Sequence, residues 1–559
     1  MISIRKLAFV LAFTPSATAL SQQTATGTAR QLSVQQWRED LHALMAGLIR
    51  THKNVYHSTS KATFDSVVAD IDARIPRLGR NEIIAEFMRL TAMVGDGHTN
   101  IYPTRDPVIA FRTLPVSLYL FSDGWYVRAA DAAHSDLVGA RIIRIGGIGI
   151  DEAYARMKPY IGRDNEMGAK FWAGYLLAMP EMLNAAHLSP SIDSANFVVE
   201  KDGKQRSVWL RHSGAAPSTP GDTDASWIRR AGWIDARGQD ALRDPLWLRH
   251  RPDSTIFWMQ VLPGTRIGYV QINQVRNSDK ESFESFSNRV LQLVDTAHLD
   301  KLIIDLRLNR GGNGGLRMTL VRGLLRRPGV NSSGRLYILT GRSTWSASQF
   351  ILNDMNSFSE ALFVGEPSGS KGNAYGDSRQ IKLPNSGITA RASIYYWQDW
   401  HPLDTRPWIG PDIAADLTFA DYRANRDPVL TAAIEERIEP GIVEQLESIL
   451  ERNDSVAAAS LFTAFRVDPR HKYVDGHELL DEVALHFYNN RQWLPAVSAF
   501  KLAATNYPDV LRAHSNLAAA YQQAGNKQGE MAALRDVLRL DPSNASALSR
   551  LKSLENAPQ

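Results

Sequence analysis

A buried strand that runs into a glycine-rich loop is found at residues 302–315, LIIDLRLNRGGNGG. Its first five residues are almost continuously apolar, which is typical of a strand covered on both faces in a parallel sheet. Similar strand patterns alternate with amphipathic helical patterns on either side of it. The predicted strands cover 267–272, 336–339 and 361–364, and the predicted helices cover 283–294, 318–325 and 347–355. This alternation predicts an α/β domain, which we place at residues 227–425.

Ser346 lies in the segment TGRSTWSASQF, residues 340–350, directly after the predicted strand 336–339. A serine between a strand and a helix places its hydroxyl at the carboxyl edge of the sheet, where α/β proteins build their sites. The amides of the first helical turn can then stabilise an oxyanion. A serine in such a place can also be a simple helix N-cap, and for this segment alone that interpretation is favoured.

Three further segments add to the case for a catalytic serine. The loop 311–315 lacks the Gly-Lys-Ser/Thr ending of a phosphate loop, so we interpret it as an oxyanion-binding loop. Lys371 follows the predicted strand 361–364 and is a candidate general base if burial keeps it neutral. An exposed lysine is the alternative at that position. His98, in GDGHT at 95–99, is a second candidate because histidine is the commonest general base, although a structural histidine is equally compatible.

The regions before the α/β domain differ in pattern. Residues 32–105 are predicted to be a helical segment, because apolar residues recur there at helical spacing. Residues 107–212 contain short strand patterns and a hairpin that turns at Asp202-Gly203, and so predict a β-rich module. The order VGARIIRIGG at 138–147 resembles the core of a PDZ module, in which such a strand leads into the helix that lines a peptide groove. A small β-rich domain without a binding role is the alternative. Residues 213–226 have the composition of a linker.

Internal repeats mark the C-terminal region, which we place at residues 440–556. Chemically similar residues recur 34 positions apart, which is the tetratricopeptide period. The pairs are Pro508 and Pro542, Ala484 and Ala518, Phe487 and Tyr521, and Ala499 and Ala533. We favour a docking surface for a protein partner, because such solenoids present concave surfaces. A helical cap that contributes only stability or dimerisation is the alternative.

Residues 1–19 have the pattern of a signal peptide. Two basic residues precede an apolar run, and Ala17-Thr18-Ala19 fits a cleavage site. We therefore expect a periplasmic or secreted protein. The chain has no cysteine, which excludes disulfides, thiolate metal sites and a lipoprotein anchor. With 63 basic and 59 acidic side chains, the net charge of +4 gives no reason to expect a nucleic-acid partner, and no later apolar stretch is long enough to span a bilayer.

Scattered histidines without an H-E-x-x-H motif make a metal site unexpected, and no cofactor is expected. The aromatic cluster Tyr395-Tyr396-Trp397, with residues 400–402, has two interpretations. It could line a substrate pocket, or it could be a packed strand, which we favour.

The ordered set of these motifs resembles the C-terminal-processing, or tail-specific, serine proteases, which are related to the tricorn protease core and to interphotoreceptor retinoid-binding protein. The resemblance covers about residues 80–420. Its pieces, in family order, are residues 95–99, the PDZ-like segment, Asp305-Leu-Arg with Asn309 and Gly311-Gly312, residues 346–349, residues 365–372 and residues 410–413. It implies a ClpP/crotonase-like β-β-α core with Ser346 as the nucleophile. It also implies oxyanion amides at Ala347 and around Gly311 and Gly312.

The family has two solutions for the general base. In the tail-specific branch a lysine activates the serine, and Lys371 matches it; a glutamine normally follows four residues later, where this chain has Tyr375. In the tricorn branch a histidine acts, and His98 matches it. That branch has a serine before the histidine, where this chain has Gly97, and it uses a distal carboxylate that Asp404 matches only loosely. We favour Lys371, because its spacing from Ser346 is the sharper match.

The sequence therefore predicts an exported serine endopeptidase that hydrolyses peptide bonds through an acyl-enzyme on Ser346. The alternative is a non-catalytic protein of the same fold that binds a peptide or an apolar ligand, since the retinoid-binding members of the family lack peptidase activity. A third interpretation makes the C-terminal repeats the main functional part, with the α/β domain as a scaffold.

Overall fold

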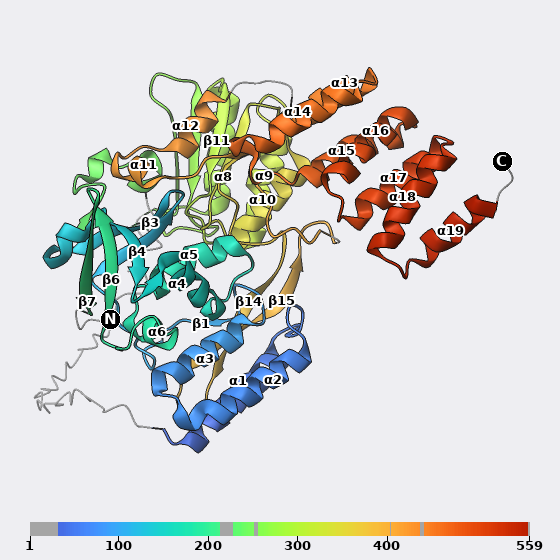
Figure 1. The fold of residues 1–559 in the computed structure, drawn as a ribbon. Helices are drawn as coiled ribbons and strands as arrows, with labels where there is room; N and C mark the ends of the chain where they lie inside the picture. The colour runs from blue at the N-terminus through green and yellow to red at the C-terminus, as the bar shows by residue number, and fades with distance from the viewer. Residues whose placement is uncertain are drawn as a thin grey trace, which may run out of the picture.

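The computed structural model describes residues 32–104, 106–212, 227, 229–250, 255–402, 404–436 and 441–556. The predicted signal peptide at 1–19 and the predicted linker at 213–226 lie outside the described residues. The described residues form a mixed α/β structure with three sheets and a C-terminal helical region (Figure 1).

A six-stranded sheet contains the strands that were predicted from the alternating pattern. Its order is β16-β13-β12-β11-β10-β9, and only β9 runs antiparallel to its neighbour. The strands are β9 (Phe257–Val261), β10 (Ile267–Ile272), β11 (Lys301–Asp305), β12 (Leu336–Thr340), β13 (Leu362–Gly365) and β16 (Ile413–Ala414). The crossover helices are α8 (Phe283–Thr296), α9 (Met318–Leu325) and α10 (Ala347–Phe358).

Both faces of this sheet are covered, which explains why its strands are continuously apolar. Along β11, Leu302 and Ile304 pack in the cluster that contains the buried residues of α8, α9 and α10. Ile303 points to the other face and packs with residues of α12 (Pro428–Glu435). Alternate side chains of one strand therefore enter two separate cores.

A seven-stranded sheet is formed by the β-rich region. Its path is β2-β3-β4-β6-β7, with β5 paired to β4 and β8 paired to β3. The strands are β2 (Val116–Phe121), β3 (Gly124–Asp131), β4 (Arg141–Ile145), β5 (Ile148–Gly149), β6 (Ser194–Lys201), β7 (Lys204–Arg211) and β8 (Trp233–Asp235). The accompanying helices are α4 (Ile150–Met157), α5 (Glu166–Leu176) and α6 (Pro180–Ala185). The β6–β7 hairpin turns at Asp202 and Gly203, which both have positive φ, as a tight two-residue turn requires.

The N-terminal helices pack on a small sheet that combines distant parts of the chain. The helices are α1 (Val34–Thr51), α2 (Lys61–Arg74) and α3 (Arg80–Ala92), and the sheet pairs β1 (Asn100–Ile101) with β15 (Thr389–Gln398) and β14 (Asn373–Lys382). Buried Asp40 on α1 accepts hydrogen bonds from the amides of Asn385 and Ser386 in the β14–β15 turn. Figure 1 shows the β14–β15 ribbon reaching from the α/β core to these helices. The chain thus crosses the domain boundaries expected from the sequence, because β14–β15 shares its core with residues 32–212.

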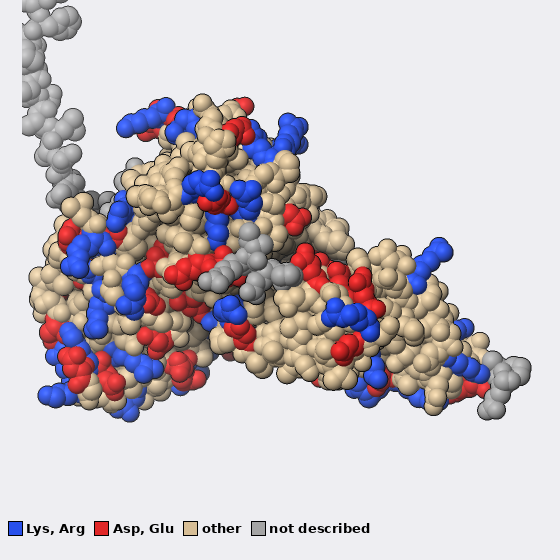
Figure 2. Space-filling model, turned by 90° about the horizontal axis from the view of Figure 1, so that it is seen from above, with Lys and Arg blue, Asp and Glu red and all other residues tan. Residues whose placement is uncertain are grey.

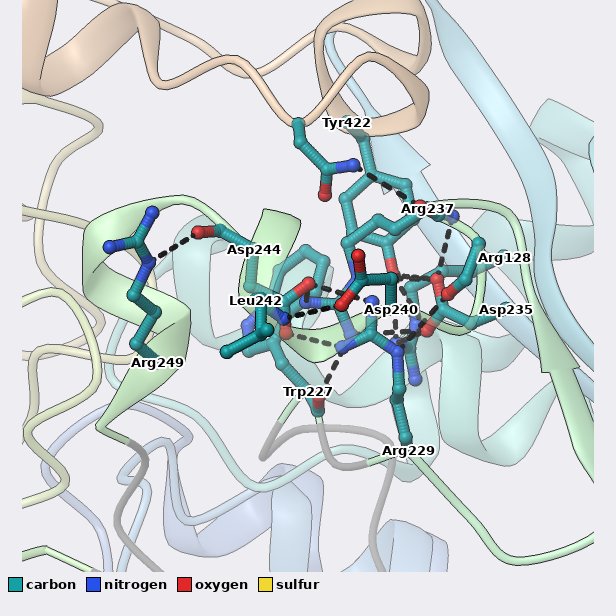
Figure 3. A network of polar contacts seen from close by, with 12 residues as sticks. Arg128, Trp227, Arg229, Asp235, Arg237, Asp240, Leu242, Asp244, Arg249 and Tyr422 are labelled. Atoms are coloured by element: carbon teal, nitrogen blue, oxygen red, sulfur yellow. Dashed lines mark hydrogen bonds and ion pairs between the residues drawn. The ribbon is translucent and has the colours of Figure 1, made fainter.

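A buried ionic network joins the seven-stranded sheet to the helices beside the α/β core (Figure 3). Asp235 on β8 lies 3.3 Å from Arg128 on β3 and 3.2 Å from Arg237. The hydroxyl of Tyr422, on α11 (Phe419–Arg423), donates to Asp235 at 2.8 Å. Arg237 also approaches Asp244, which comes just before α7 (Leu246–Arg249). A single carboxylate therefore ties together elements from three parts of the sequence.

Helices α13 to α19 follow one another away from the core, as Figure 1 shows at the C-terminal end. They are α13 (Ile442–Glu451), α14 (Ser455–Val467), α15 (Gly476–Asn489), α16 (Trp493–Asn506), α17 (Leu511–Gln523), α18 (Lys527–Leu540) and α19 (Ala545–Asn556). The alanines paired by the 34-residue spacing, at 484, 518, 499 and 533, are all buried in one apolar cluster between the helices. Small residues at these positions let neighbouring helices approach closely.

The surface carries both signs of charge. On the face seen in Figure 2, Lys and Arg side chains are interspersed with Asp and Glu and do not form one basic patch. Within the described residues, no helix is both long and apolar enough to cross a bilayer.

Candidate active site

Ser346 stands at the junction of β12 and α10 in a strained backbone conformation. Its φ is 57° and its ψ is −124°, a region that non-glycine residues rarely adopt. Such strain costs about 1–3 kcal/mol and is concentrated at functional sites. The Ser346 side chain makes no capping hydrogen bond to α10, and its amide donates to Ser370 Oγ at 3.1 Å. The simple N-cap interpretation of this serine is therefore wrong.

The glycine-rich loop after β11 lies directly against Ser346. Gly311 has a φ of 103°, and a Cβ added there would lie 2.7 Å from Ser346 Cβ and 3.0 Å from the amide nitrogen of Ala347. A Cβ added at Gly312, where φ is 140°, would lie 2.3 Å from the carbonyl oxygen of Val275. Only glycine permits these approaches, since a side chain at 311 would push the loop away from Ser346 and one at 312 would push it away from Val275.

Two amides beside Ser346 are available to an oxyanion. The Gly311 amide already donates to Asn309 Oδ1 at 2.9 Å, so the contribution of this residue is steric. Within the described part of the chain, the amides of Gly312 and Ala347 donate no hydrogen bond. Of the three predicted oxyanion residues, Gly312 in the loop after β11 and Ala347 at the start of α10 thus offer unpaired N–H groups, the kind of donor that stabilises an oxyanion.

His98 faces Ser346. Its Nε2 lies 3.1 Å from Ser346 Oγ, within the range in which a base takes a proton. Its ring stacks on the indole of Trp345, with centroids 3.9 Å apart and planes inclined by 20°. Its Nδ1 is buried and makes no hydrogen bond within the described residues. The structure therefore brings together two predicted site residues that are remote in sequence.

Asp96 holds the backbone of the His98 loop. Its Oδ1 accepts hydrogen bonds from the amides of His98 and Thr99, at 2.9 and 2.7 Å, and from Ser393 Oγ on β15. Burial alone would raise the pKa of Asp96, but the hydrogen bond from His52, with those from Ser393 and Thr99, outweighs it and leaves the pKa below its usual value. The loop that carries the candidate base is thus fixed by an ionised carboxylate.

Lys371 lies in the loop between β13 and β14 and is half-buried. Within the described residues it makes no hydrogen bond with Ser346, whose hydroxyl pairs with His98 instead. The charge of Lys371 acts on His57, the pKa of which is lowered to about 4, mainly by burial and in smaller part by His52 and Lys371. The preference for Lys371 that the sequence spacing suggested is thus not matched by the geometry.

The two residues expected to support the base have other partners. The Tyr375 ring packs against the rings of His57 and His52, with centroids 4.3 and 4.8 Å apart. Asp404 accepts from Trp400 Nε1 at 2.5 Å and pairs with Arg406 at 2.6 Å. Burial would raise the pKa of Asp404, but these two hydrogen bonds outweigh it and lower the pKa. Neither residue contacts His98 or Ser346 among the described interactions.

The cluster of His52, His57 and Asp96 brings three possible metal-ligand atoms within 4.8 Å of one another. The protonation of His52 does not fit a metal site, however. Its Nδ1 accepts from the amide of Asn54 at 3.0 Å, so its Nε2 carries the proton and donates to Asp96 Oδ2 at 3.0 Å. A metal at Nε2 would need that lone pair. We therefore interpret the cluster as support for the His98 loop.

Two residues of the site were missed by sequence reasoning. Trp345 stood inside the quoted Ser346 segment without a role, and Asp164 lies in the predicted β-rich region. Asp164 accepts from Gly97 N and from Trp345 Nε1, so it touches the neighbours of both His98 and Ser346. No motif or spacing points to Asp164, because its contacts exist only after distant segments have packed together.

Exposed aromatic residues flank the same site. On β15, Tyr395 is 53% exposed and Trp397 is 39% exposed, so these residues do lie in a strand, as the preferred interpretation expected, but their side chains are not packed in a core. The Trp397 indole lies 5.5 Å from the Phe350 ring, one turn after Ser346 on α10. Between Trp397 and His98 lies Gly376, where an added Cβ would be 3.0 Å from the indole and 3.7 Å from His98 Cε1.

This arrangement defines a serine-type peptidase, and comparison with known families agrees. Residues 266–327, which include β10, β11 and the glycine-rich loop, match the model of peptidase family S41. The match confirms the resemblance to C-terminal-processing serine proteases that the motifs predicted.

Several solved structures are similar to the chain. Mature CPAF complexed with lactacystin has 14% identity and a TM-score of 0.48, over 75% of this chain and all of that one. The photosystem II D1 C-terminal processing protease has 13% identity and a TM-score of 0.32, over 69% of this chain and 93% of that one. The tricorn protease has 13% identity and a TM-score of 0.30, over 71% of this chain and 36% of that one. No curated protein sequence matches the chain.

Proposed function

We propose that the protein is an exported endopeptidase of the tail-specific type, with Ser346 as nucleophile and His98 as general base. The observation that carries this proposal is the 3.1 Å contact between His98 Nε2 and Ser346 Oγ, beside the unpaired amides of Gly312 and Ala347. Ser346 Oγ attacks a peptide carbonyl while His98 Nε2 takes the hydroxyl proton. The two amides stabilise the oxyanion, and His98 then gives the proton to the leaving amine. Water hydrolyses the acyl-enzyme by the same route.

The experiment that tests this function is acylation of the purified protein by a fluorophosphonate probe, followed by mapping of the labelled residue. We expect covalent modification at Ser346 alone, because among the described residues its hydroxyl is the one that pairs with His98 and lies beside the unpaired amide of Ala347. A protein that is folded but not acylated would overturn the proposal. That result would indicate a binding protein of the same fold.

The identity of the base is tested by two matched substitutions. His98→Ala is expected to slow acylation by about 10²–10⁴-fold, the usual contribution of a positioned general base. Lys371→Ala is expected to slow it by less than about ten-fold, because Lys371 acts only as a neighbouring charge. Rates of fluorophosphonate labelling under identical conditions give both values. The reverse order of the two effects would assign the base to Lys371.

We also propose that the aromatic side chains of β15 bind apolar side chains of the peptide substrate. Tyr395 and Trp397 are exposed next to the reacting groups, where exposed aromatic area is costly without a ligand. Trp397→Ala is expected to raise KM by about ten-fold for an apolar peptide, with kcat changed less. Phe358→Ala, at an exposed phenylalanine at the C-terminal end of α10, is the control and should leave KM unchanged. Equal KM values for both variants would contradict the assignment.

The regions outside the catalytic core have proposed roles in recognition. For residues 107–212 we propose a PDZ-like peptide-binding module, supported by the order of β4, β5 and α4. For residues 440–556 we propose tetratricopeptide-like repeats that bind a protein partner. A groove between residues 406–413 and helices α13 to α15 and α17 supports this role. Export is supported by the pattern of residues 1–19, and N-terminal sequencing of protein recovered from the periplasm or medium would test it.

A further inference from the structure

Asp164 is a buried carboxylate that bridges the two catalytic segments. It precedes α5 and is 7% exposed. Its Oδ1 accepts the amide of Gly97 at 2.9 Å, and its Oδ2 accepts the indole N–H of Trp345 at 3.0 Å. Gly97 is the residue before His98, and Trp345 is the residue before Ser346. One side chain therefore fixes the backbone next to the base and the ring next to the nucleophile.

The Trp345 ring is in turn the surface on which His98 rests. The two rings are nearly parallel, 3.9 Å apart. A Cβ added at Gly97 would lie 3.0 Å from Trp345 Cζ2, so glycine is needed there for the indole to lie flat against the loop. A Cβ added at Gly376 of β14 would lie 3.7 Å from His98 Cε1, so this strand backbone also lies close to the ring. The imidazole thus packs against an indole and near a strand backbone.

This arrangement differs from a Ser-His-Asp triad in one respect. In a triad a carboxylate hydrogen-bonds to histidine Nδ1 and fixes the ring orientation and tautomer. Here His98 Nδ1 has no hydrogen-bond partner within the described residues. The orientation of the ring must therefore come from packing, and the Trp345 indole that provides it is itself oriented by Asp164.

We propose that Asp164 is the positioning residue of this active site. Through the Trp345 indole and the Gly97 amide it holds the His98 ring in line with Ser346. Its negative charge also favours the imidazolium that forms when His98 takes the serine proton. This inference rests on the proposed function of His98 as the base, and extends it to a carboxylate outside the motifs of the α/β domain.

The charged and polar groups around Asp164 determine the pKa of its carboxyl. Burial raises the pKa of the Asp164 carboxyl, the charge of His98 and the two hydrogen bonds lower it in part, and the nearby Asp96 raises it further. The pKa of Asp164 therefore stays above its usual value. The other charged groups near Asp164 are three arginines that line the same cavity, Arg163, Arg310 and Arg342. The charge of Lys371 acts on His57.

The test is Asp164→Asn, which keeps the shape of the side chain and removes its charge. The asparagine has one acceptor oxygen for two N–H donors, so at least one of the two hydrogen bonds is lost. We expect kcat to fall about 100-fold, since small misplacements of catalytic groups cost that much, with KM changed far less. The acidic limb of the profile of kcat/KM against pH should move to lower pH, because the imidazolium loses a neighbouring negative charge.

Trp345→Phe is the second variant, because it keeps a ring under His98 but removes the N–H donor. We expect a fall of about ten-fold in kcat. Asp295→Asn, at an exposed aspartate of α8 paired with Arg327, is the control and should behave as the wild type. Thermal unfolding confirms that each variant is folded, and Trp345→Phe carries the test if Asp164→Asn does not fold.

The outcomes separate this inference from the proposed function. If the wild type is not acylated by the fluorophosphonate, the proposed function fails and the inference fails with it. If the wild type is acylated but folded Asp164→Asn keeps the wild-type kcat and pH profile, the inference alone is overturned. A loss of kcat without any shift of the pH profile would also overturn the proposed effect of the Asp164 charge on the imidazolium.

Discussion

Ser346→Ala is expected to abolish both peptide hydrolysis and fluorophosphonate labelling while the protein remains folded. The loss follows because no other hydroxyl in the described structure is paired with His98 and placed beside the amides of Gly312 and Ala347. Removal of the nucleophile of a serine protease lowers kcat by on the order of 10⁶-fold. Residual turnover after this substitution should therefore be close to the background rate.

The fold should tolerate this change because the Ser346 hydroxyl makes no structural hydrogen bond to the helix that it precedes. The strained φ of 57° costs about the same for alanine as for serine. Ser357→Ala, at an exposed serine on the same helix, is the matched control and should retain full activity. Peptide hydrolysis by folded Ser346→Ala at a rate near that of the control would exclude Ser346 as the nucleophile.

Asp235→Ala is expected to produce the largest loss of stability. The substitution leaves Arg128 and Arg237 buried without the carboxylate that lies between them (Figure 3). Removing one partner of a buried ion pair costs about 3–5 kcal/mol. Urea unfolding followed by tryptophan fluorescence should show this as a lower midpoint of the transition that includes the seven-stranded sheet.

The control is Asp300→Ala, which removes the acidic partner of Arg266 in an exposed ion pair. Such pairs contribute little because solvent screens them, so the midpoint should remain near that of the wild type. The same midpoint for Asp235→Ala and Asp300→Ala would show that the buried network does not stabilise the fold.

The Asp235 contribution should also depend on pH. Burial alone would raise the pKa of Asp235, but the charges of Arg128 and Arg237 outweigh it, and the pKa lies below its usual value. A carboxylate with a lowered pKa in the folded state contributes its full stabilisation of the fold at pH values above its unfolded-state pKa of about 3.9. That stabilisation is lost as the pH falls through the lower folded-state pKa. The difference in stability between wild type and Asp235→Ala should therefore shrink in acid.

The α/β core was the most predictable part of the fold. The strand expected over 267–272 is β10, and the helix expected over 318–325 is α9, with the same bounds. These elements are buried on both faces or carry a clear apolar stripe, so local pattern and tertiary environment agree. The position of Ser346 followed from the same local order of strand, turn and helix.

The organisation into contiguous domains was less predictable. Strand β8 comes from after the predicted linker but pairs with β3, and β14–β15 leaves the α/β core to pair with β1. Short strands of two or three residues carry too little pattern to be found by periodicity. Their pairing depends on segments hundreds of residues away, which no local window can detect.

The general base shows the limit of spacing as a guide. The position of Lys371 after Ser346 favoured it over His98, yet the Ser346 hydroxyl contacts His98 and no described interaction joins it to Lys371. The amide of Gly311 was likewise expected at the oxyanion, but it already donates a hydrogen bond to Asn309 Oδ1. Sequence motifs identify which residues gather at a site, whereas hydrogen-bond geometry shows which role each residue can take.

By itself, the sequence determined the α/β core, the place of Ser346 at the edge of its sheet and the glycines that must approach it, because these follow from local burial and backbone sterics. Only the tertiary structure decided which base faces the serine. It also decided that Asp164 hydrogen-bonds to the residues that precede the base and the serine. The β1–β15 pairing and the packing of α5 bring His98, Trp345 and Asp164 together from distant parts of the chain. Contacts of this kind depend on the burial of whole elements against one another, and no neighbouring residues encode them.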